Sequence, residues 1–117
     1  MTPEAKLQSE CFKWFRYAYP RYKKLFFAIP NGGSRNKIEA KNLKHQGVVS
    51  GVSDTCLAVP RGQYHGLYVE FKYGRNKLSD EQEEFLKEVA SQGYATATVW
   101  SFDEFSDVIL NYLSDGR

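Results

Sequence analysis

The spacing of apolar residues along the chain predicts a regular alternation of helices and strands. A first helix is expected to begin after Thr2, with Pro3 at its first position, and to end before Pro20, because apolar residues recur there at helical spacing. Further helices are expected over about residues 34–47, with Ile38 and Leu43 as apolar anchors, and over about residues 79–93 and 103–113. Short strands are expected at residues 25–29, 55–59, 66–73 and 95–101.

The order of these elements predicts the fold class. The strands at 55–59 and 66–73 are close enough in sequence to form a hairpin, whereas a helix separates the strand at 66–73 from the one at 95–101. This order predicts an α/β fold with a central mixed sheet of about four strands flanked by helices. The length of 117 residues fits one compact domain over residues 1–117.

The composition places the chain among globular proteins rather than disordered ones, with 42% hydrophobic and 26% charged residues. No apolar run approaches the roughly 20 residues that a membrane span needs. The first ten residues lack the apolar core of a signal peptide. A cytoplasmic protein without membrane contact is therefore expected. Cys11 and Cys56 lack metal-ligand spacing and are expected to be small buried side chains.

Charge is distributed unevenly along the sequence. Residues 1–77 contain 14 Lys and Arg but 5 Asp and Glu, whereas residues 78–117 contain 2 and 9. A basic front of this kind indicates a polyanionic partner on one face, unless folding interleaves the charges in space. Three lysines at helical spacing, Lys37, Lys41 and Lys44, would form one basic stripe with Arg35 nearby. The stripe suits phosphate contacts, although it could also serve solubility alone.

The strand at 66–73 raises a chemical question, because it carries two charges among apolar residues. Side chains alternate between the faces of a strand, so Leu67, Val69 and Phe71 share one face and Glu70 and Lys72 the other. The pair could be ordinary polar decoration of a half-exposed strand. However, Asp54 comes just before the preceding strand, so a hairpin could bring Asp54 beside Glu70.

Two converging carboxylates with a nearby lysine suit Mg²⁺ or Mn²⁺ and a phosphodiester substrate. Asp54 could instead be a turn residue that stabilises its own loop, after the glycines at 47 and 51. Glu10 lies between Leu7 and Trp14 at helical spacing and is expected to face inward, toward either a metal site or a salt bridge. Gln82 fits a capping box with Ser79.

These residues, taken in order, resemble the VRR-NUC domain of the PD-(D/E)xK nuclease superfamily. The resemblance rests on Glu10 and on the motifs "NGG" (31–33), "GVSD" (51–54), "EFK" (70–72) and "LSDEQ" (78–82), which together cover nearly the whole chain. It implies a restriction-endonuclease-like core. Two departures stand out: Ser53 replaces the proline before the motif aspartate, and no Val-Arg-Arg run occurs, which leaves the substrate preference open.

The resemblance also implies roles for individual residues. Asp54 and Glu70 would hold the metal together with the main-chain carbonyl of Phe71, and Lys72 would be the catalytic lysine. Glu10 would be an additional metal ligand and Gln82 a helix residue at the active site. Asn31, Arg35, Lys37, Lys41 and Lys44 are the expected DNA-binding residues.

Stand-alone phage or bacterial members of this family resemble Holliday-junction resolvases. The expected function is therefore a Mg²⁺- or Mn²⁺-dependent endonuclease that cleaves branched or flapped DNA in replication, repair or recombination and acts as a homodimer. One alternative is a non-catalytic nucleic-acid-binding or assembly protein that keeps the nuclease fold. A sequence-specific restriction-type enzyme is the other, although 117 residues leave little room for a recognition domain.

Overall fold

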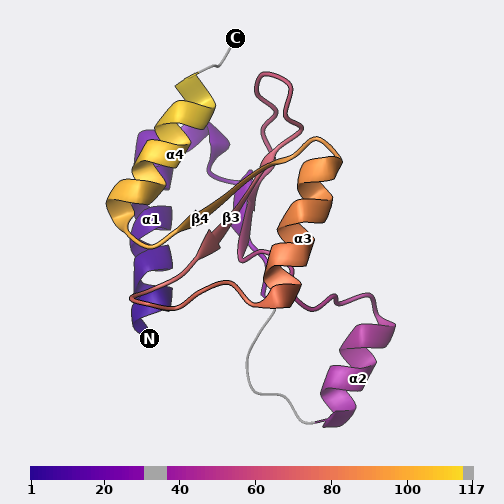
Figure 1. The fold of residues 1–117 in the computed structure, drawn as a ribbon. Coiled ribbons are helices and arrows are strands. Elements are labelled where there is room, and N and C mark those ends of the chain that lie inside the picture. The colour runs from indigo at the N-terminus through magenta and orange to yellow at the C-terminus, as the bar shows by residue number, and fades with distance from the viewer. Residues whose placement is uncertain (31–36, 115–117) are drawn as a thin grey trace.

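The structure is a computed structural model, and it describes residues 1–30 and 37–114. Its strands form one four-stranded sheet in the order β1-β2-β3-β4, with helices on both faces (Figure 1). The helices are α1 (Pro3–Ala18), α2 (Lys37–His45), α3 (Asp80–Ser91) and α4 (Phe102–Ser114), with a short 3₁₀ helix at Pro20–Tyr22. The strands are β1 (Phe26–Ala28), β2 (Thr55–Leu57), β3 (Leu67–Phe71) and β4 (Ala95–Val99).

The sheet is mixed, as the element order predicts. Strands β1, β2 and β3 pair antiparallel, and β3 pairs parallel with β4. Helix α3 makes the crossover between the two parallel strands, which cannot be joined by a tight turn. The α/β class and the mixed sheet with flanking helices are therefore confirmed. The strands are shorter than expected, and β2 ends at Leu57, before Pro60, which has no backbone N–H for a ladder.

The main core lies between one face of the sheet and the pair α1 and α4 (Figure 1). The expected inward face of β3 is confirmed, because Leu67, Val69 and Phe71 are all buried there. Phe26 joins the two helices to the sheet, since its ring packs against the rings of Phe15 and Phe105. Helix α3 covers the opposite face of the sheet, and the functional residues of β3 lie on that side.

The first and third helices begin as their sequences predict. The Thr2 hydroxyl accepts a hydrogen bond from the Ala5 amide, and Pro3 opens α1. Ser79 and Gln82 form a reciprocal capping box at the start of α3. Both cysteines are buried free thiols, as expected. Within the described part of the chain, no helix has the length and apolar character to cross a membrane.

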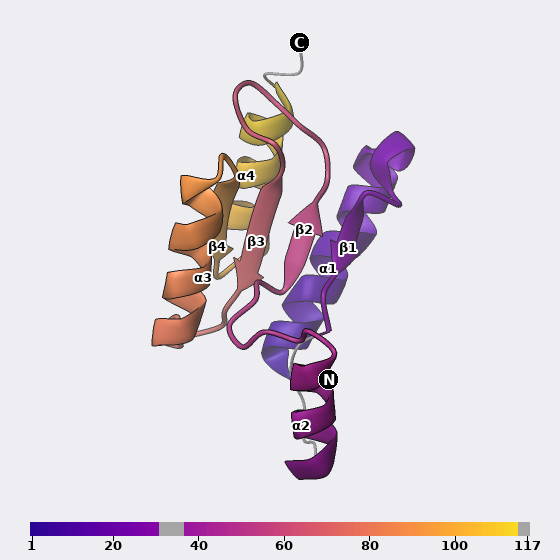
Figure 2. The same ribbon diagram turned by 90° about the vertical axis from the view of Figure 1, so that its right-hand side faces the viewer.

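Helix α2 differs from the other helices because it extends away from the sheet (Figure 2). It has no buried residue. Ile38 was expected to be an apolar anchor, but its side chain is 73% exposed, so that expectation is wrong. The physical reason is that no described element covers the side of α2 on which Ile38 lies; Leu43, the other expected anchor, is partly buried.

Candidate active site

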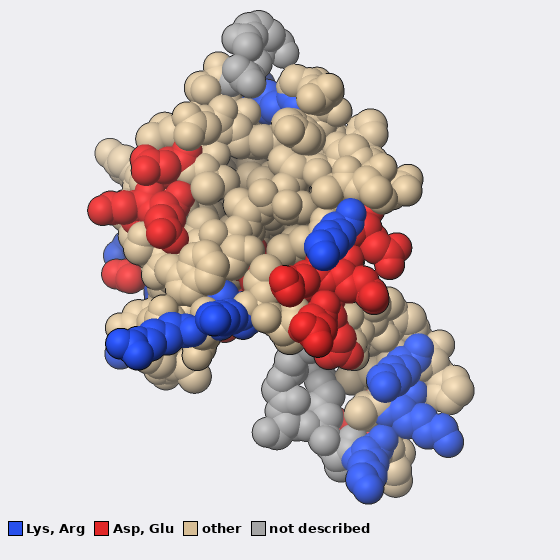
Figure 3. Space-filling view, in the orientation of Figure 1, with Lys and Arg blue, Asp and Glu red and all other residues tan. Residues whose placement is uncertain are grey.

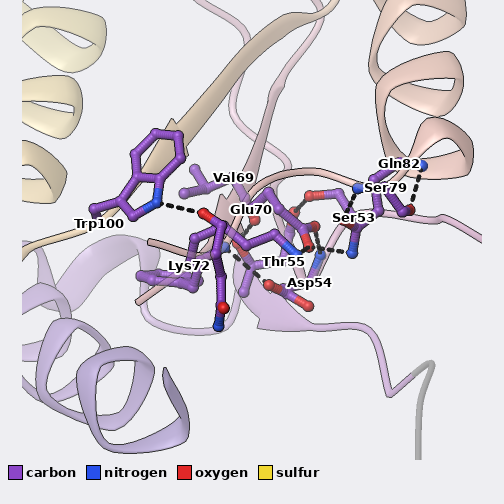
Figure 4. Close-up of polar contacts among 11 residues, drawn as sticks. Ser53, Asp54, Thr55, Val69, Glu70, Lys72, Ser79, Gln82 and Trp100 are labelled. Atoms are coloured by element: carbon purple, nitrogen blue, oxygen red, sulfur yellow. Dashed lines mark hydrogen bonds and ion pairs between the residues drawn. The ribbon is translucent and has the colours of Figure 1, made fainter. Parts of the chain in front are cut away.

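The hairpin of β2 and β3 brings Asp54 and Glu70 together. Thr55 pairs with Val69, so the residue before β2 lies opposite the fourth residue of β3. The Asp54 amide donates to Glu70 Oε1 at 3.0 Å, and the Phe71 amide donates to Asp54 Oδ2 at 2.8 Å. Figure 4 shows these hydrogen bonds. The Glu70 carboxylate therefore accepts a hydrogen bond from the amide of Asp54, and the Asp54 carboxylate accepts one from the amide of the residue after Glu70. These two hydrogen bonds fix both side chains.

The two charges of β3 are not surface decoration. Glu70 is 1% exposed and Lys72 is 8% exposed. The side chain of Gln82, in the first turn of α3, lies against Glu70. Lys72 Nζ lies 3.7 Å from Glu70 Oε2. A buried lysine and glutamate at this distance form a close ion pair, in which the ammonium is held beside the carboxylate pair.

Gln82 has two structural roles, and the structure shows both. Its side-chain oxygen accepts from the Ser79 amide at 2.9 Å, which completes the cap of α3. Its side-chain nitrogen donates to Glu70 Oε2 at 2.8 Å. One amide group therefore fixes the N-terminus of α3 and orients the buried carboxylate.

Burial disfavours the ionised forms of both acids, and the nearby Asp54 carboxylate adds to this effect at Glu70. Burial, followed by the nearby Asp54 carboxylate, raises the pKa of Glu70 from 4.5 to about 7. Burial also raises the pKa of Asp54, although the hydrogen bond from the Phe71 amide and the Lys72 ammonium oppose this effect. The folded chain thus holds two carboxylates at an electrostatic cost, which a cation between them would relieve.

Gly51 positions the loop that delivers Asp54. Its φ is +85°, a conformation that side chains with a Cβ rarely adopt. A Cβ at this position would lie 2.5 Å from the main-chain oxygen of Glu81 in α3. The loop can therefore approach the first turn of α3 because residue 51 is glycine.

A contact near the site was missed in the sequence reasoning. The Trp100 indole donates from Nε1 to the Asn76 carbonyl at 2.9 Å, and the Trp100 amide donates to Glu104 Oε1. The indole bond ties the loop after Lys72 to the end of β4, and the amide bond ties that end to the first turn of α4. The contact joins residues 24 positions apart, and no local pattern in the sequence marks it.

The expectation that Glu10 faces inward is wrong. Glu10 is exposed, because the buried side of α1 is formed by Leu7, Cys11, Phe12 and Phe15. Because successive residues of an α-helix are 100° apart around its axis, position 10 lies well away from the centre of that side. Among the described residues, no group of three or more His, Cys, Asp or Glu side chains is placed to hold a metal ion. The role of Glu10 as an additional metal ligand stays a prediction.

The expected DNA-binding residues are only partly described. Asn31 and Arg35 lie outside the described residues. Lys37, Lys41 and Lys44 are all exposed on α2, which projects from the sheet (Figure 2). Their role in DNA binding stays a prediction.

Comparison with known proteins identifies the family. The model of the VRR-NUC domain matches residues 3–102. The chain belongs to the VRR-NUC family. A solved structure described as a VRR-NUC domain protein is similar in fold, with a TM-score of 0.84 and 25% sequence identity over 97% of this chain and 89% of the other. A search of curated proteins found no match.

Membership of the VRR-NUC family places the chain among nucleases, and the four-stranded mixed sheet with its flanking helices is consistent with the fold of this family. The matched range contains every residue of the carboxylate, lysine and glutamine cluster described above. The restriction-endonuclease-like fold expected from the sequence is therefore confirmed.

Proposed function

We propose that this VRR-NUC chain is a divalent-metal-dependent, structure-selective DNA endonuclease. The observation that carries the proposal is the convergence of the partly buried Asp54 with the buried Glu70, and Lys72 Nζ lies 3.7 Å from Glu70. A structural ion pair would need one carboxylate for one lysine. The second carboxylate adds to the effect of burial and raises the pKa of Glu70, so the cluster holds the two acids at an electrostatic cost that a bound cation would relieve.

The donor set fits Mg²⁺ or Mn²⁺. Asp54 and Glu70 supply the hard oxygen ligands that these ions prefer, and the electrostatic cost of holding both acids ionised favours a cation there. The Phe71 carbonyl is proposed as a third ligand. In an extended strand the N–H and C=O of one residue point to the same edge, and the Phe71 N–H is bonded to Asp54.

A bound cation would polarise the scissile phosphate and stabilise the charge that develops on it. The protein supplies position and a hydrogen-bond donor. Lys72 is proposed to donate from Nζ to the attacking water or to the phosphate oxygen, and its burial keeps the ammonium group in place. Gln82 is a positioning residue, because its amide nitrogen donates a hydrogen bond to Glu70 Oε2. The carboxylate is thereby oriented with its other oxygen, Oε1, next to Asp54.

The proposed substrate is branched or flapped DNA, including Holliday junctions, in replication, repair or recombination. Residues 1–117 would act as one nuclease module in the cytoplasm, and two copies would present two sites to two strands. Support for this comes from membership of the VRR-NUC family.

The test is cleavage of labelled four-way junctions, flaps and linear duplexes with Mg²⁺, Mn²⁺ or EDTA. Lys72→Ala is expected to lower kcat by about 100-fold or more, because it removes a group that acts in the transition state. Lys77→Ala is the matched control, since Lys77 is an exposed lysine on the same loop.

Metal-dependent cleavage that is lost in Lys72→Ala and kept in Lys77→Ala would support the proposal. DNA binding by the wild type without cleavage under any metal condition would favour the non-catalytic alternative. Equal turnover of the two lysine variants would show that Lys72 is not catalytic.

A further inference from the structure

Helix α1 and strand β1 border an open cleft at one edge of the sheet. Strand β1 is the end strand in the order β1-β2-β3-β4, so β2 is its one partner among the described strands. Figure 2 shows β1 at this edge with α1 alongside it. The cleft between them has a volume of about 600 Å³. The space beside β1 is therefore open on the side where a further strand would pair.

One side of α1 lies along this α1–β1 cleft. The residues on that side recur at spacings of three and four, so they form a row along the helix. The row consists of Ala5, Gln8, Ser9, Phe12 and Arg16. It is about 16 Å long, which matches about five residues of an extended strand. Helix α1 therefore offers a surface of the right length to a strand that the described sheet does not contain.

The outer edge of β1 presents backbone groups toward the cleft. In an antiparallel pair, successive residues of a strand alternate between bonding the neighbouring strand and pointing away from it. The Ile29 amide donates to the Asp54 carbonyl at 2.7 Å, so Ile29 bonds on the β2 side. By alternation, Phe26 and Ala28 direct their N–H and C=O groups away from β2, and both residues line the cleft. An extended peptide supplies the donors and acceptors that such an edge pairs with.

The cleft is basic at one end. Arg16, Lys23 and Lys24 line it and are exposed, whereas no Asp or Glu is among the described residues that line it. The Arg16 guanidinium lies 5.4 Å from the centroid of the Phe12 ring, which stacks on the Phe26 ring at 4.2 Å. Acidic side chains gather instead over α3 (Figure 3), on the opposite face of the sheet. The cleft thus combines cations at one end with aromatic and small side chains along its length.

We propose that the α1–β1 cleft binds an extended acidic segment of a partner protein, which adds a fifth strand beside β1. The backbone of the segment would pair with the N–H and C=O groups of Phe26 and Ala28. Its acidic residues would contact the three cations, and its apolar residues would lie over the row on α1. Binding of this kind does not depend on the nuclease chemistry.

The chemistry of the cleft favours this occupant over two others. A DNA backbone carries hydrogen-bond acceptors and no donors, so it would leave the carbonyls of Phe26 and Ala28 without partners. A second copy of this chain would bring another β1 edge with the same three cations into the cleft, which costs electrostatic energy. An acidic peptide meets neither difficulty.

The test is fluorescence anisotropy of the full chain, in EDTA, with labelled peptides of about eight residues. Each peptide has Asp or Glu at the first or the last few positions and Val, Ile, Leu or Phe elsewhere, because a strand can pair in either direction. Wild type is expected to bind members of this set. The same peptides with Lys in place of the acidic residues should bind about tenfold more weakly or worse.

Charge reversal tests the basic end of the cleft. Lys23→Glu combined with Lys24→Glu should weaken binding of the acidic peptides by about tenfold or more. Lys6→Glu combined with Lys13→Glu is the matched control, because these are two exposed lysines of α1 that do not line the cleft. The control should bind with wild-type affinity, and circular dichroism checks that both variants fold.

Peptides that are N-methylated at alternate residues test the strand pairing on the wild-type protein. One methylated set carries its methyl groups on the edge that faces β1 and should lose binding, whereas the other set carries them toward solvent and should bind like the unmodified peptide. This comparison uses no variant, so it does not depend on how a substitution affects folding.

Absence of binding by every peptide would overturn the proposal, as expected if the lysines only protect the edge from aggregation. Equal affinities of the two double variants, or equal effects of the two methylated sets, would also overturn it. Tighter binding of single-stranded oligothymidylate than of any peptide would assign the cleft to nucleic acid. A wild-type dimer that dissociates in the Lys23 and Lys24 variant would assign it to a second copy. Cleavage is measured separately, so failure of this proposal and failure of the nuclease proposal give different results.

Discussion

Glu70 should make the metal-free protein less stable as pH rises through the neutral range. The pKa of Glu70 rises from 4.5 to about 7 on folding. Between these two values the folded state binds more protons than the unfolded chain, so the free energy of unfolding falls with increasing pH. Each pKa unit corresponds to about 1.4 kcal/mol, so ionisation of Glu70 costs the folded state up to about 3 kcal/mol.

The perturbation is Glu70→Gln, and the assay is urea unfolding in EDTA at about pH 5, 6, 7 and 8. The variant cannot ionise at residue 70, so its free energy of unfolding should depend much less on pH than that of wild type. The substituted side chain would also place an amide group where a carboxylate oxygen now accepts a hydrogen bond from the Gln82 nitrogen. Loss of that hydrogen bond would lower the free energy of unfolding by about 1 kcal/mol at every pH. The informative quantity is therefore the slope with pH and not the absolute stability.

Glu81→Gln provides the matched control, because Glu81 is an exposed glutamate at the start of α3. Its slope should equal that of wild type. Excess Mg²⁺ or Mn²⁺ should flatten or reverse the wild-type slope, since cation binding to the ionised site adds stability as pH rises. Equal slopes for wild type and Glu70→Gln would refute the argument that burial and Asp54 hold Glu70 partly protonated.

Three further variants test the site by independent measurements. Asp54→Asn keeps an acceptor for the β3 amide but removes a charge, so calorimetry should show metal affinity at least about tenfold weaker; unchanged affinity would exclude Asp54 as a ligand. Gly51→Ala should lower the free energy of unfolding by about 1–3 kcal/mol more than Gly47→Ala, because position 47 also has positive φ but has open space around it. Ser79→Ala should weaken the α3 cap by about 1 kcal/mol in urea unfolding, whereas Gln82→Ala should weaken the cap and also lower kcat. Equal kcat values for the Ser79 and Gln82 variants would show that Gln82 serves only the cap.

Local patterns in the sequence were sufficient to predict most elements and the central pair of the site. Strand alternation correctly separated Glu70 and Lys72 from Val69 and Phe71, and the hairpin correctly placed Asp54 beside Glu70. The capping box also appeared where the sequence predicted it. These features depend on residues that are close in sequence or joined by one turn, which is why pattern reasoning succeeded.

Features that depend on tertiary packing were not predictable in the same way. Glu10 fits the helical spacing of Leu7 and Trp14. However, the elements that pack on α1 decide which side of the helix is buried, and the buried side is centred near Cys11. The exposure of Ile38 depends on where α2 extends relative to the sheet, which its own sequence does not encode. The Trp100 contact likewise needs the folded sheet to exist.

The double role of Gln82 restricts which residue can occupy that position. A capping box accepts glutamate as readily as glutamine, so the helix alone would tolerate either. Glutamate at position 82 would place a third carboxylate against Glu70 Oε2, which now accepts a hydrogen bond from the amide nitrogen. The side chain must therefore offer an acceptor to the Ser79 amide and a donor to Glu70 at the same time. Of the two capping residues, only the neutral amide meets both demands, so the first turn of α3 and the acidic cluster select the same amino acid for different reasons.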